Sequence, residues 1–303
     1  MHDRPQLNRA TGGHDDFGGL HRDLSALIDR RQAMRLVGGV GVAALLGACS
    51  RATTSSAPTA EPATSTETTS AISSETTGDT STTTSSVDTS ASTESVFSAG
   101  DEIPDESGGP FPADGTNGPN VLTETGVERQ DITTSFAGLA GTADGIPLQF
   151  QLTVVDASSG AALPGAAVYI WHCTADALYS VYEEADQNYL RGLQVADSNG
   201  LVTFTSVYPG CYPGRWPHAH LEIYDEITSA TSGGAAAKTS QLALPETVSV
   251  DAYQDPRYGD SAGNLGRLSL ASDNVFSDGW EDQLATVAGS AATGYTASLL
   301  VRI

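Results

Sequence analysis

Apolar and polar side chains alternate strictly in the stretch Leu148-Gln149-Phe150-Gln151-Leu152-Thr153-Val154. A period of two is typical of a β-strand with one buried and one solvated face. Short apolar runs separated by turn residues predict further strands at 167–173, 190–196, 201–207, 217–224, 241–244 and 296–303. Asp197-Ser198-Asn199-Gly200 is a predicted turn, and no long segment has a helical period apart from a turn or two at 246–253. The pattern predicts an all-β domain with long loops, a single β-sandwich of the immunoglobulin or prealbumin type.

Apolar runs that could form a core are confined to the second half of the 303-residue chain. From Ser50 to about Ser98 the sequence is almost entirely Ser, Thr, Ala, Glu, Asp and Pro. Such a segment cannot bury enough apolar area to offset its chain entropy, so we expect a disordered spacer. The predicted division is a signal peptide at 1–48, a disordered Ser/Thr-rich linker at 49–100 and one domain at 101–303.

The N-terminal region has the layout of a secretion signal. Arg30-Arg31-Gln32-Ala33-Met34-Arg35 precedes a glycine-rich apolar run, 36–48, which is shorter than the about 20 residues that cross a bilayer. Paired arginines resemble a twin-arginine signal, with an ordinary secretory signal as the alternative. Leu46-Gly47-Ala48-Cys49 resembles a bacterial lipobox. We therefore expect an exported domain that is lipid-anchored through Cys49 outside the cytoplasmic membrane, or secreted.

The charge balance excludes two classes of partner. The chain has 37 acidic and 14 basic residues and a formal net charge of -23, and six of the basic residues precede Cys49. The exported part therefore repels the phosphates of nucleic acids and anionic lipid headgroups. No nucleic acid is expected as a partner, and the membrane is expected to be contacted only through the lipid anchor.

Cys173 and Cys211 are left as a pair once Cys49 is assigned to the lipobox. Oxidising conditions outside the cell favour a disulfide between them. On the chain-entropy model such a bridge would stabilise the fold by about 3 to 4 kcal/mol. Two buried free thiols are the alternative.

Chemistry-bearing side chains are concentrated in Tyr212-Pro213-Gly214-Arg215-Trp216-Pro217-His218-Ala219-His220. If this segment enters a strand, His218 and His220 point to the same face, because side chains two apart share a face. A solvated pair of histidines is the alternative. Apart from the leader, the chain has only one other histidine, His172. This scarcity favours a metal-binding pair.

Two imidazoles alone would suit Zn²⁺ or Cu²⁺. Two tyrosines, Tyr179 and Tyr212, change that expectation, although each alone would be interpreted as a core aromatic. Phenolate is a hard anionic ligand, so two phenolates with two imidazoles favour Fe³⁺, which also depresses the phenol pKa.

Five segments together resemble a known family. They are Val168-Tyr169-Ile170-Trp171-His172-Cys173, Tyr179-Ser180, Leu190-Arg191-Gly192-Leu193-Gln194, residues 197–200 and residues 208–220. Over roughly residues 103–303 the chain resembles the intradiol ring-cleavage dioxygenases, which include protocatechuate 3,4-dioxygenase and catechol 1,2-dioxygenase. The likeness is greatest to the secreted intradiol dioxygenase-like proteins of bacteria and fungi.

The resemblance implies a role for each matching residue. Tyr179 matches the first iron tyrosinate, and Tyr212 matches the second, which catecholate displaces. His218 and His220 match the histidine ligands. Arg215 matches the arginine that stabilises negative charge on the ring and on the intermediates of O₂ attack. The implied cofactor is Fe³⁺, and the implied partners are a catechol-type aromatic substrate and O₂.

The resemblance also implies a reaction. Catechol would bind Fe³⁺ as a dianion while Tyr212 leaves the metal and takes up a substrate proton. The metal would make the ring reactive toward O₂, which inserts between the two hydroxylated carbons to give a cis,cis-muconate-type diacid. His172 has no counterpart among the ligands and is expected either to be structural or to support the ligands from behind.

Two departures from the family pattern shape the substrate expectation. Only five residues separate Tyr212 from His218, fewer than in the dedicated catabolic enzymes, and the N-terminal helical dimerisation region is replaced by the signal and linker. We therefore expect a site open to bulky or polymer-attached catechols. Two other functions stay open: a non-catalytic sandwich module on a stalk, and a Cu²⁺- or Zn²⁺-binding protein that uses His218 and His220.

Overall fold

The computed structural model describes residues 96–303. The predicted signal peptide, the lipobox at Cys49 and the linker up to residue 95 lie outside the described residues. Within residues 96–303, no helix has the length and apolar character needed to cross a membrane.

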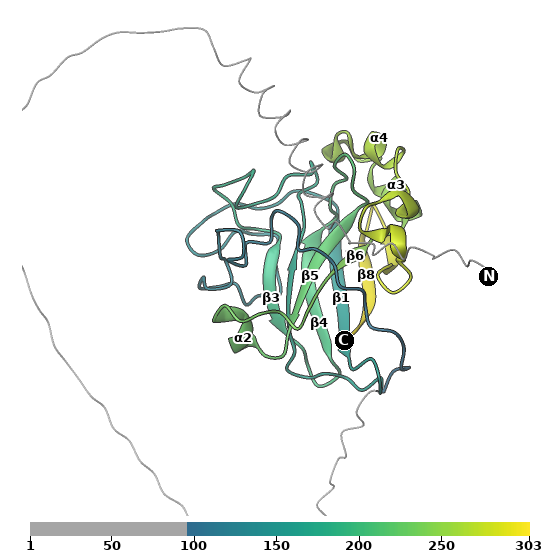
Figure 1. Cartoon of the computed structure of the whole chain (residues 1–303). Helices are drawn as coiled ribbons and strands as arrows, with labels where there is room; N and C mark the ends of the chain where they lie inside the picture. The colour runs from purple at the N-terminus through teal and green to yellow at the C-terminus, as the bar shows by residue number, and fades with distance from the viewer. Residues whose placement is uncertain (1–95) are drawn as a thin grey trace, which may run out of the picture. The chain divides into compact units, whose positions relative to one another are not determined.

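Two four-stranded sheets form the domain that residues 96–303 make (Figure 1). The first sheet has the order β4-β1-β8-β7, from Leu201–Val207, Pro147–Val155, Gly294–Arg302 and Thr286–Ser290. The second has the order β3-β2-β5-β6, from Arg191–Val195, Ala167–Trp171, His218–Tyr224 and Lys238–Ala243. Neighbouring strands run antiparallel except β1 and β8, which are parallel.

Short helices occupy the connections between strands. The α-helices are α2 (Ile227–Thr231), α3 (Glu246–Ala252) and α4 (Ser261–Leu265), and the 3-10 turns are η1 (Pro256–Tyr258), η2 (Leu270–Ser272) and η3 (Phe276–Asp278). α3 lies where the sequence predicts a turn or two of helix. It contacts α4 at one end of the sandwich (Figure 1).

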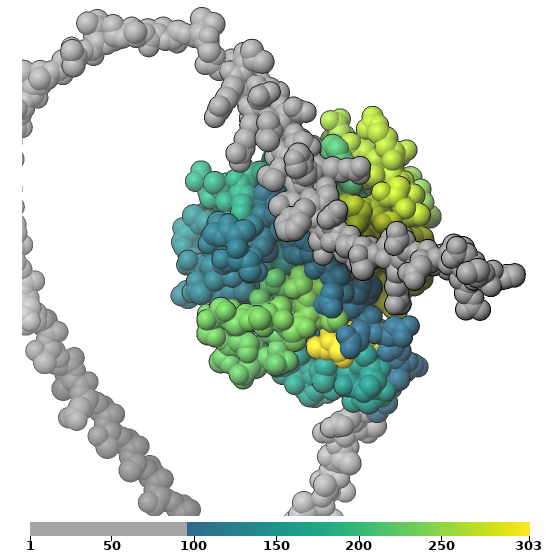
Figure 2. Space-filling view, in the orientation of Figure 1, coloured from purple at the N-terminus to yellow at the C-terminus, as the bar shows by residue number. Residues whose placement is uncertain are grey.

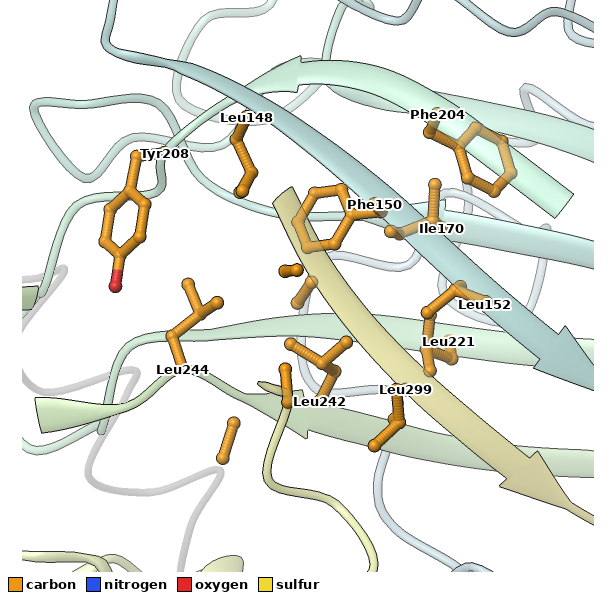
Figure 3. Packing of buried hydrophobic residues seen from close by; sticks show 14 of the residues in the cluster. Leu148, Phe150, Leu152, Ile170, Phe204, Tyr208, Leu221, Leu242, Leu244 and Leu299 are labelled. Carbon is orange, nitrogen blue, oxygen red and sulfur yellow. The ribbon is translucent and has the colours of Figure 1, made fainter. Parts of the chain in front are cut away.

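The inner faces of the two sheets share one core (Figure 3). Leu148, Phe150 and Leu152 of β1 are at most 1% exposed and belong to the same core cluster as Ile170 and Leu221 of the second sheet. This packing confirms the predicted β-sandwich with few helices, because each sheet buries one face against the other. The narrower likeness to an immunoglobulin or prealbumin sandwich stays a prediction.

The predicted turn at 197–200 is present. The Asp197 carboxylate accepts hydrogen bonds from the backbone N–H groups of Asn199 (2.8 Å) and Leu201 (2.9 Å), and Gly200 has a φ of +75°. The turn does not join a hairpin, however, because β3 and β4 belong to different sheets. It carries the chain across the sandwich.

β5 has one face in the core and one face outside it. Ala219, Leu221 and Ile223 lie in the core between the sheets. His218 and His220 lie on the opposite face, where a second cluster of buried side chains forms under loops from the first half of the domain. Its members include Ala113, Val121, Leu122, Tyr169, Trp171, Ala177 and Tyr179. Residues from the start of the domain, in blue, accordingly make up much of the surface seen in Figure 2.

Candidate metal centre

The histidine pair predicted from the sequence points to one place. His218 and His220 are each 2% exposed, and their Nε2 atoms are 3.1 Å apart. β5 is paired on both sides, with β2 and with β6, so the backbone that carries the two imidazoles is fixed by two ladders. The prediction that both side chains share a face is confirmed.

The two predicted tyrosines reach the same place from loops. Tyr179 Oη is 3.3 Å from His220 Nε2, Tyr212 Oη is 3.2 Å from His218 Nε2, and the two Oη atoms are 3.4 Å apart. The four atoms form a closed ring. Donors about 2.1 Å from a single ion, at angles between octahedral and tetrahedral, are about 3.0 to 3.4 Å apart. The ring therefore has the dimensions of a metal-ligand set.

The protonation states of the imidazoles also suit a metal. His218 Nδ1 is 2.5 Å from the Trp216 carbonyl oxygen, so Nδ1–H donates and the lone pair of Nε2 faces the ring. Burial and the positive charge of Arg215 lower the pKa of His218 to about 3. Burial and His218 lower the pKa of His220 well below its usual value. Both imidazoles are therefore neutral at pH 7, as metal ligands must be.

His220 is oriented by packing. Its ring stacks on Trp171 at a centroid distance of 4.9 Å and an interplanar angle of 5°. Its Nδ1 atom is buried and has no hydrogen-bond partner among the described residues. Gly109 also lies against this ring, since a Cβ there would be 3.2 Å from His220 Cε1. The ring is thus packed on an indole, and a glycine lies next to its Cε1 atom.

Tyr179 is a buried phenol at 2% exposure. Burial, followed by the nearby Tyr212 and Cys173, raises its pKa well above the usual value. Alone, this phenol stays protonated at neutral pH. A bound cation stabilises the phenolate and so lowers the pKa of the phenol. We therefore expect Tyr179 to lose its proton when a metal ion binds.

Arg191 fixes the loop that carries Tyr179. Its guanidinium is fully buried and donates to the Ser180 hydroxyl (3.1 Å) and to the Ser180 carbonyl (3.0 Å). It also donates to the carbonyl oxygens of Phe111 (2.8 Å) and Pro112 (3.0 Å). One side chain thereby connects β3, the Tyr179 loop and the segment 104–112, which we call the strap.

The strap contacts the site at several points. Gly109 lies against His220, and the Phe111 ring lies 5.0 Å from the Tyr179 ring. The Ser107 carbonyl accepts a hydrogen bond of 2.7 Å from Gln241 on β6. The sequence predicts the start of the domain here, and the structure shows that this start is also a wall of the site.

Tyr212 differs from the other three donors because it is half-buried. Its loop is held from behind, since Ser261 and Asn264 of α4 bind the backbone N–H (2.9 Å) and carbonyl (2.8 Å) of Cys211. The two residues after it, Pro213 and Gly214, are exposed. Of the four donors, this phenol is the most exposed.

Arg215 is 3% exposed and is close enough to the ring of donors for its charge to act on Tyr179, His218 and His220. Its Nε donates to Asp273 (3.1 Å) and its Nη2 donates to Gln241 (2.6 Å). Burial would lower the pKa of Arg215, but Tyr212 and Asp273 outweigh burial and raise the pKa, so the guanidinium is charged. Its charge lowers the pKa values of Tyr179, His218 and His220.

Asp273 and Gln241 were not found by sequence reasoning. Asp273 is fully buried and follows η2, far along the chain from Arg215. Gln241 lies on β6, within a stretch that the sequence predicts only as a strand. Neither position carries a sequence signal that distinguishes it from other acidic or amide residues, so only the fold shows that both bind Arg215.

The predicted disulfide is wrong. Cys173 and Cys211 are buried free thiols, which was the alternative. Each sulfur faces a backbone carbonyl instead: Cys173 Sγ lies 3.4 Å from the Gly210 oxygen, and Cys211 Sγ lies 3.5 Å from the Arg215 oxygen. Burial, with the neighbouring Asp273, raises the pKa of Cys211 to about 12. The loop before Tyr212 is therefore held by hydrogen bonds to α4.

His172 lies apart from the ring of donors and is buried. Its Nδ1 is 2.8 Å from the Cys173 carbonyl and its Nε2 is 2.7 Å from the Ser206 hydroxyl. Since Ser206 is on β4 of the first sheet, the imidazole connects the two sheets. Burial lowers its pKa to about 4. These contacts agree with a structural role for His172.

Within residues 96–303, no place gathers three or more His, Cys, Asp or Glu side chains suited to a metal ion. A donor set in this part of the chain must therefore include other residue types. The ring of two phenols and two imidazoles meets that requirement, and its hard and borderline donors suit a trivalent iron.

Comparisons with known proteins found similar sequences and folds. A family model described as Dioxygenase matches residues 116–231. The intradiol ring-cleavage dioxygenase from Tetranychus urticae has a TM-score of 0.53 and 24% identity, over 67% of this chain and 94% of that one. A dioxygenase domain from Streptomyces sp. SirexAA-E has a TM-score of 0.42 and 19% identity, over 67% and 98% of the two chains. A search of curated proteins gave no match.

The resemblance stated from the sequence is therefore confirmed at the level of family and fold. The matched region includes Tyr179, Tyr212, Arg215 and both histidines of β5. This chain is therefore similar to the Dioxygenase family over residues 116–231, and its fold is similar to that of an intradiol ring-cleavage dioxygenase.

Proposed function

We propose that the domain is a non-haem Fe(III) intradiol dioxygenase that cleaves catechol-type rings between the two hydroxylated carbons. Both atoms of O₂ enter the product, a muconate-type diacid, so no external reductant is needed. One observation carries the proposal: four donor atoms from Tyr179, Tyr212, His218 and His220 close a ring with edges of 3.1 to 3.4 Å, beside the charged Arg215.

These four residues would hold the iron, which when bound supplies Lewis acidity and makes a catecholate reactive toward O₂. Tyr179 and the two imidazoles are buried and anchored, so they suit a permanent role. Their positions are set before any substrate arrives, which lowers the cost of assembling the site.

Tyr212 is suited to a changing role. Its phenol is half-buried and its loop carries the exposed Pro213 and Gly214, so the ring has room to turn outward. On leaving, its oxygen can receive the proton of a substrate hydroxyl, as a general base within hydrogen-bond reach. The residue thereby couples substrate entry to substrate ionisation.

Arg215 is suited to stabilise charge that develops on the substrate. Its guanidinium is charged, planar and buried, and it is already fixed by Asp273 and Gln241. Preorganised donors of this kind stabilise a developing anion without reorganising during the reaction, and losing one typically costs about 10²- to 10³-fold in rate.

The exposed side of the site supports a proposal about the size of the substrate. The short connection between Tyr212 and His218 leaves Pro213 and Gly214 at the surface, next to the displaceable phenol. We propose that bulky or polymer-attached catechols are accepted. Turnover of small free catechols alone, with no reaction on lignin-like or polyphenol-linked catechols, would contradict this part.

The decisive experiment measures colour and oxygen uptake. The iron-loaded protein should be red-brown from tyrosinate-to-iron charge transfer and should consume O₂ with a panel of catechols. Tyr179→Phe should lose the colour and the activity. Tyr295→Phe is the matched control, since this buried phenol on β8 binds Asp251 (2.6 Å) away from the site and should keep both.

The same experiment tests the alternatives. A colourless protein that takes up copper or zinc through His218 and His220 would overturn the dioxygenase proposal. A protein that binds no metal at all would support a non-catalytic module on a stalk.

We also propose that the domain acts outside the cytoplasm. The support is the order of sequence features in residues 1–95: paired arginines, a short apolar run, a lipobox ending at Cys49 and a Ser/Thr-rich linker. Cell fractionation of the full chain and of Cys49→Ala tests this, because the substitution should release the protein from the membrane fraction.

A further inference from the structure

We propose that Asp273 is a positioning residue for the reaction, because it sets the orientation of Arg215 beside the metal centre. This inference rests on the proposed function. It concerns a carboxylate that the sequence did not single out, on a loop between η2 and η3.

The hydrogen bonds of Asp273 show how it is built in. One oxygen, Oδ2, accepts from Arg215 Nε (3.1 Å) and from the Trp216 backbone N–H (2.7 Å). The other, Oδ1, accepts from the backbone N–H groups of Val275 (2.8 Å) and Phe276 (3.2 Å). The carboxylate is fully buried. Both oxygens therefore accept two hydrogen bonds each. Through this one side chain, the loop before η3 is joined to the segment that carries Arg215, Trp216 and the two histidines.

The geometry restricts the guanidinium. Asp273 binds Nε, Gln241 binds Nη2, and the Phe276 ring lies 6.0 Å from Cζ. Two hydrogen bonds at different nitrogens leave a planar group little rotational freedom. Gln241 is in turn fixed by the Ser107 carbonyl of the strap (2.7 Å). Arg215 is thus held from two sides, and Asp273 is the carboxylate with which it forms a salt bridge.

The charge balance gives Asp273 a second effect. A buried guanidinium close to a metal ion repels it, and a carboxylate at 3.1 Å offsets that repulsion. Burial would raise the pKa of Asp273, but Arg215 and the backbone N–H groups outweigh burial and lower it, so the carboxylate is ionised. Removing this charge leaves Arg215 buried and uncompensated, which is strongly unfavourable.

Asp273→Asn tests the role with an isosteric change. The amide cannot accept at both oxygens, so Arg215 loses its charged partner and half of the acceptor set is lost. We expect the iron-loaded variant to keep the tyrosinate band and to bind catechol anaerobically within about threefold of the wild type. Its kcat should fall by about 10²-fold, the lower end of the effect of losing a preorganised charge stabiliser. A purely structural residue would change the band, the affinity and the rate together.

Asp251→Asn is the control. This carboxylate also accepts two hydrogen bonds, from the Tyr295 hydroxyl (2.6 Å) and the Ala291 backbone N–H (3.3 Å), but it lies on α3 away from the donors. Its variant should lose stability and keep kcat.

A double-mutant cycle keeps the inference testable if Asp273→Asn folds poorly. Residues that act through one another show non-additive losses. Arg215→Gln and Arg215→Gln/Asp273→Asn should therefore have equal kcat within about threefold. Without metal, the double variant should have a higher Tm than Asp273→Asn, because no buried charge is left unpaired.

Three results would overturn the role of Asp273: an unchanged kcat in Asp273→Asn, a visible band and a catechol affinity that change together with kcat, or losses that multiply in the double variant. All three presuppose a wild type that is coloured and consumes O₂. A wild type with neither property would overturn the proposed function and this inference with it, so the two failures are distinguishable.

Discussion

The imidazoles and the phenols of the site are held in different ways. His218 and His220 lie on a central strand of the second sheet, paired with β2 and β6, and both are 2% exposed. Tyr179 and Tyr212 lie on loops that are held by side chains from elsewhere: Arg191 behind Tyr179, and Ser261 and Asn264 behind Tyr212.

This difference makes Tyr212 the adjustable donor of the site. Ladder hydrogen bonds fix the strand-borne donors and Tyr179 is buried, whereas the half-buried Tyr212 can move when its loop moves. The proposed function needs both properties, since a reaction that displaces one ligand requires the remaining donors to keep the metal in place. Substitutions of the anchored donors and of Tyr212 should therefore have different consequences.

The largest effect is expected from His220→Ala. Removing a strand-borne donor leaves three donors and a cavity beside Trp171. Mutating a residue that only supports a metal ligand lowers metal affinity by about 10- to 100-fold, so losing the ligand itself should lower iron affinity by more than that. Tyr212→Phe should retain iron more tightly and show a shifted visible band. Competition with a chelator measures both. Equal loss of iron in the two variants would show that the loop-borne phenol is as rigid as the imidazole.

Gly109→Ala should have the next largest effect. Gly109 has a φ of +70°, and an added Cβ would lie 3.2 Å from His220 Cε1. The left-handed backbone costs about 1 to 2 kcal/mol for alanine, or about 2 to 8 °C in Tm for a domain of this size. The contact should also shift His220 and weaken iron binding by about 10-fold.

Gly233→Ala is the matched control for that substitution. Its φ is +79°, and an added Cβ would meet nothing within 4 Å. It should show the same loss of Tm with unchanged iron affinity. If both variants bound iron as the wild type does, the strap would not orient His220.

A smaller effect is expected from Glu106→Gln on the strap. Burial, opposed by the hydrogen bond from Gln283, raises the pKa of Glu106 to about 7 from 4.5. An acid whose pKa is raised on folding holds more protons in the folded state, so stability falls as pH rises from about 4.5 to 7. Glu106→Gln should therefore raise Tm at pH 8 and change it little at pH 4.5.

Unfolding curves at the two pH values check the sign. Asp101→Asn, at an exposed carboxyl shortly before the strap in the sequence, serves as the control and should shift Tm at neither pH. A Tm gain for Glu106→Gln at pH 4.5 as large as at pH 8 would contradict ionisation as the cause.

The smallest effect is expected from reducing agents. Because Cys173 and Cys211 are free thiols, a reductant should leave Tm unchanged. The loop before Tyr212 depends on α4, so Ser261→Ala should lower Tm where reduction does not. If reduction lowered Tm by several degrees, the protein would contain a disulfide between Cys173 and Cys211 after all.

Most strands could be predicted from the sequence because the alternation of apolar and polar residues is a property of each strand by itself. Alternation in β1 and the spacing of His218 and His220 both follow from the period of a single strand, and the structure confirms them. β7, at 286–290, was not predicted, because it is a short edge strand with exposed residues and a glycine at φ +107°.

Only part of the site could be predicted from the sequence, because much of it depends on contacts between distant segments. Tyr179 and Tyr212 could be selected among ten tyrosines only through the family pattern. Asp273, Gln241 and the strap act through contacts between segments that are far apart in the chain. The periodic pattern of residues within one segment cannot predict such contacts. The cysteine prediction failed because an even count fixes neither the direction of a sulfur nor its preferred partner.

The parallel pairing of β1 with β8 has a consequence for the order of assembly. β1 starts at Pro147 and is registered against a strand that ends at Arg302, so one of its two ladders depends on the most distant partner in the domain. Contacts of such high sequence separation are slow to form, because a long loop must close first. During synthesis, the sheet that carries both imidazoles has all four strands once Ala243 has emerged, whereas the opposing sheet waits for the last ten residues of the domain.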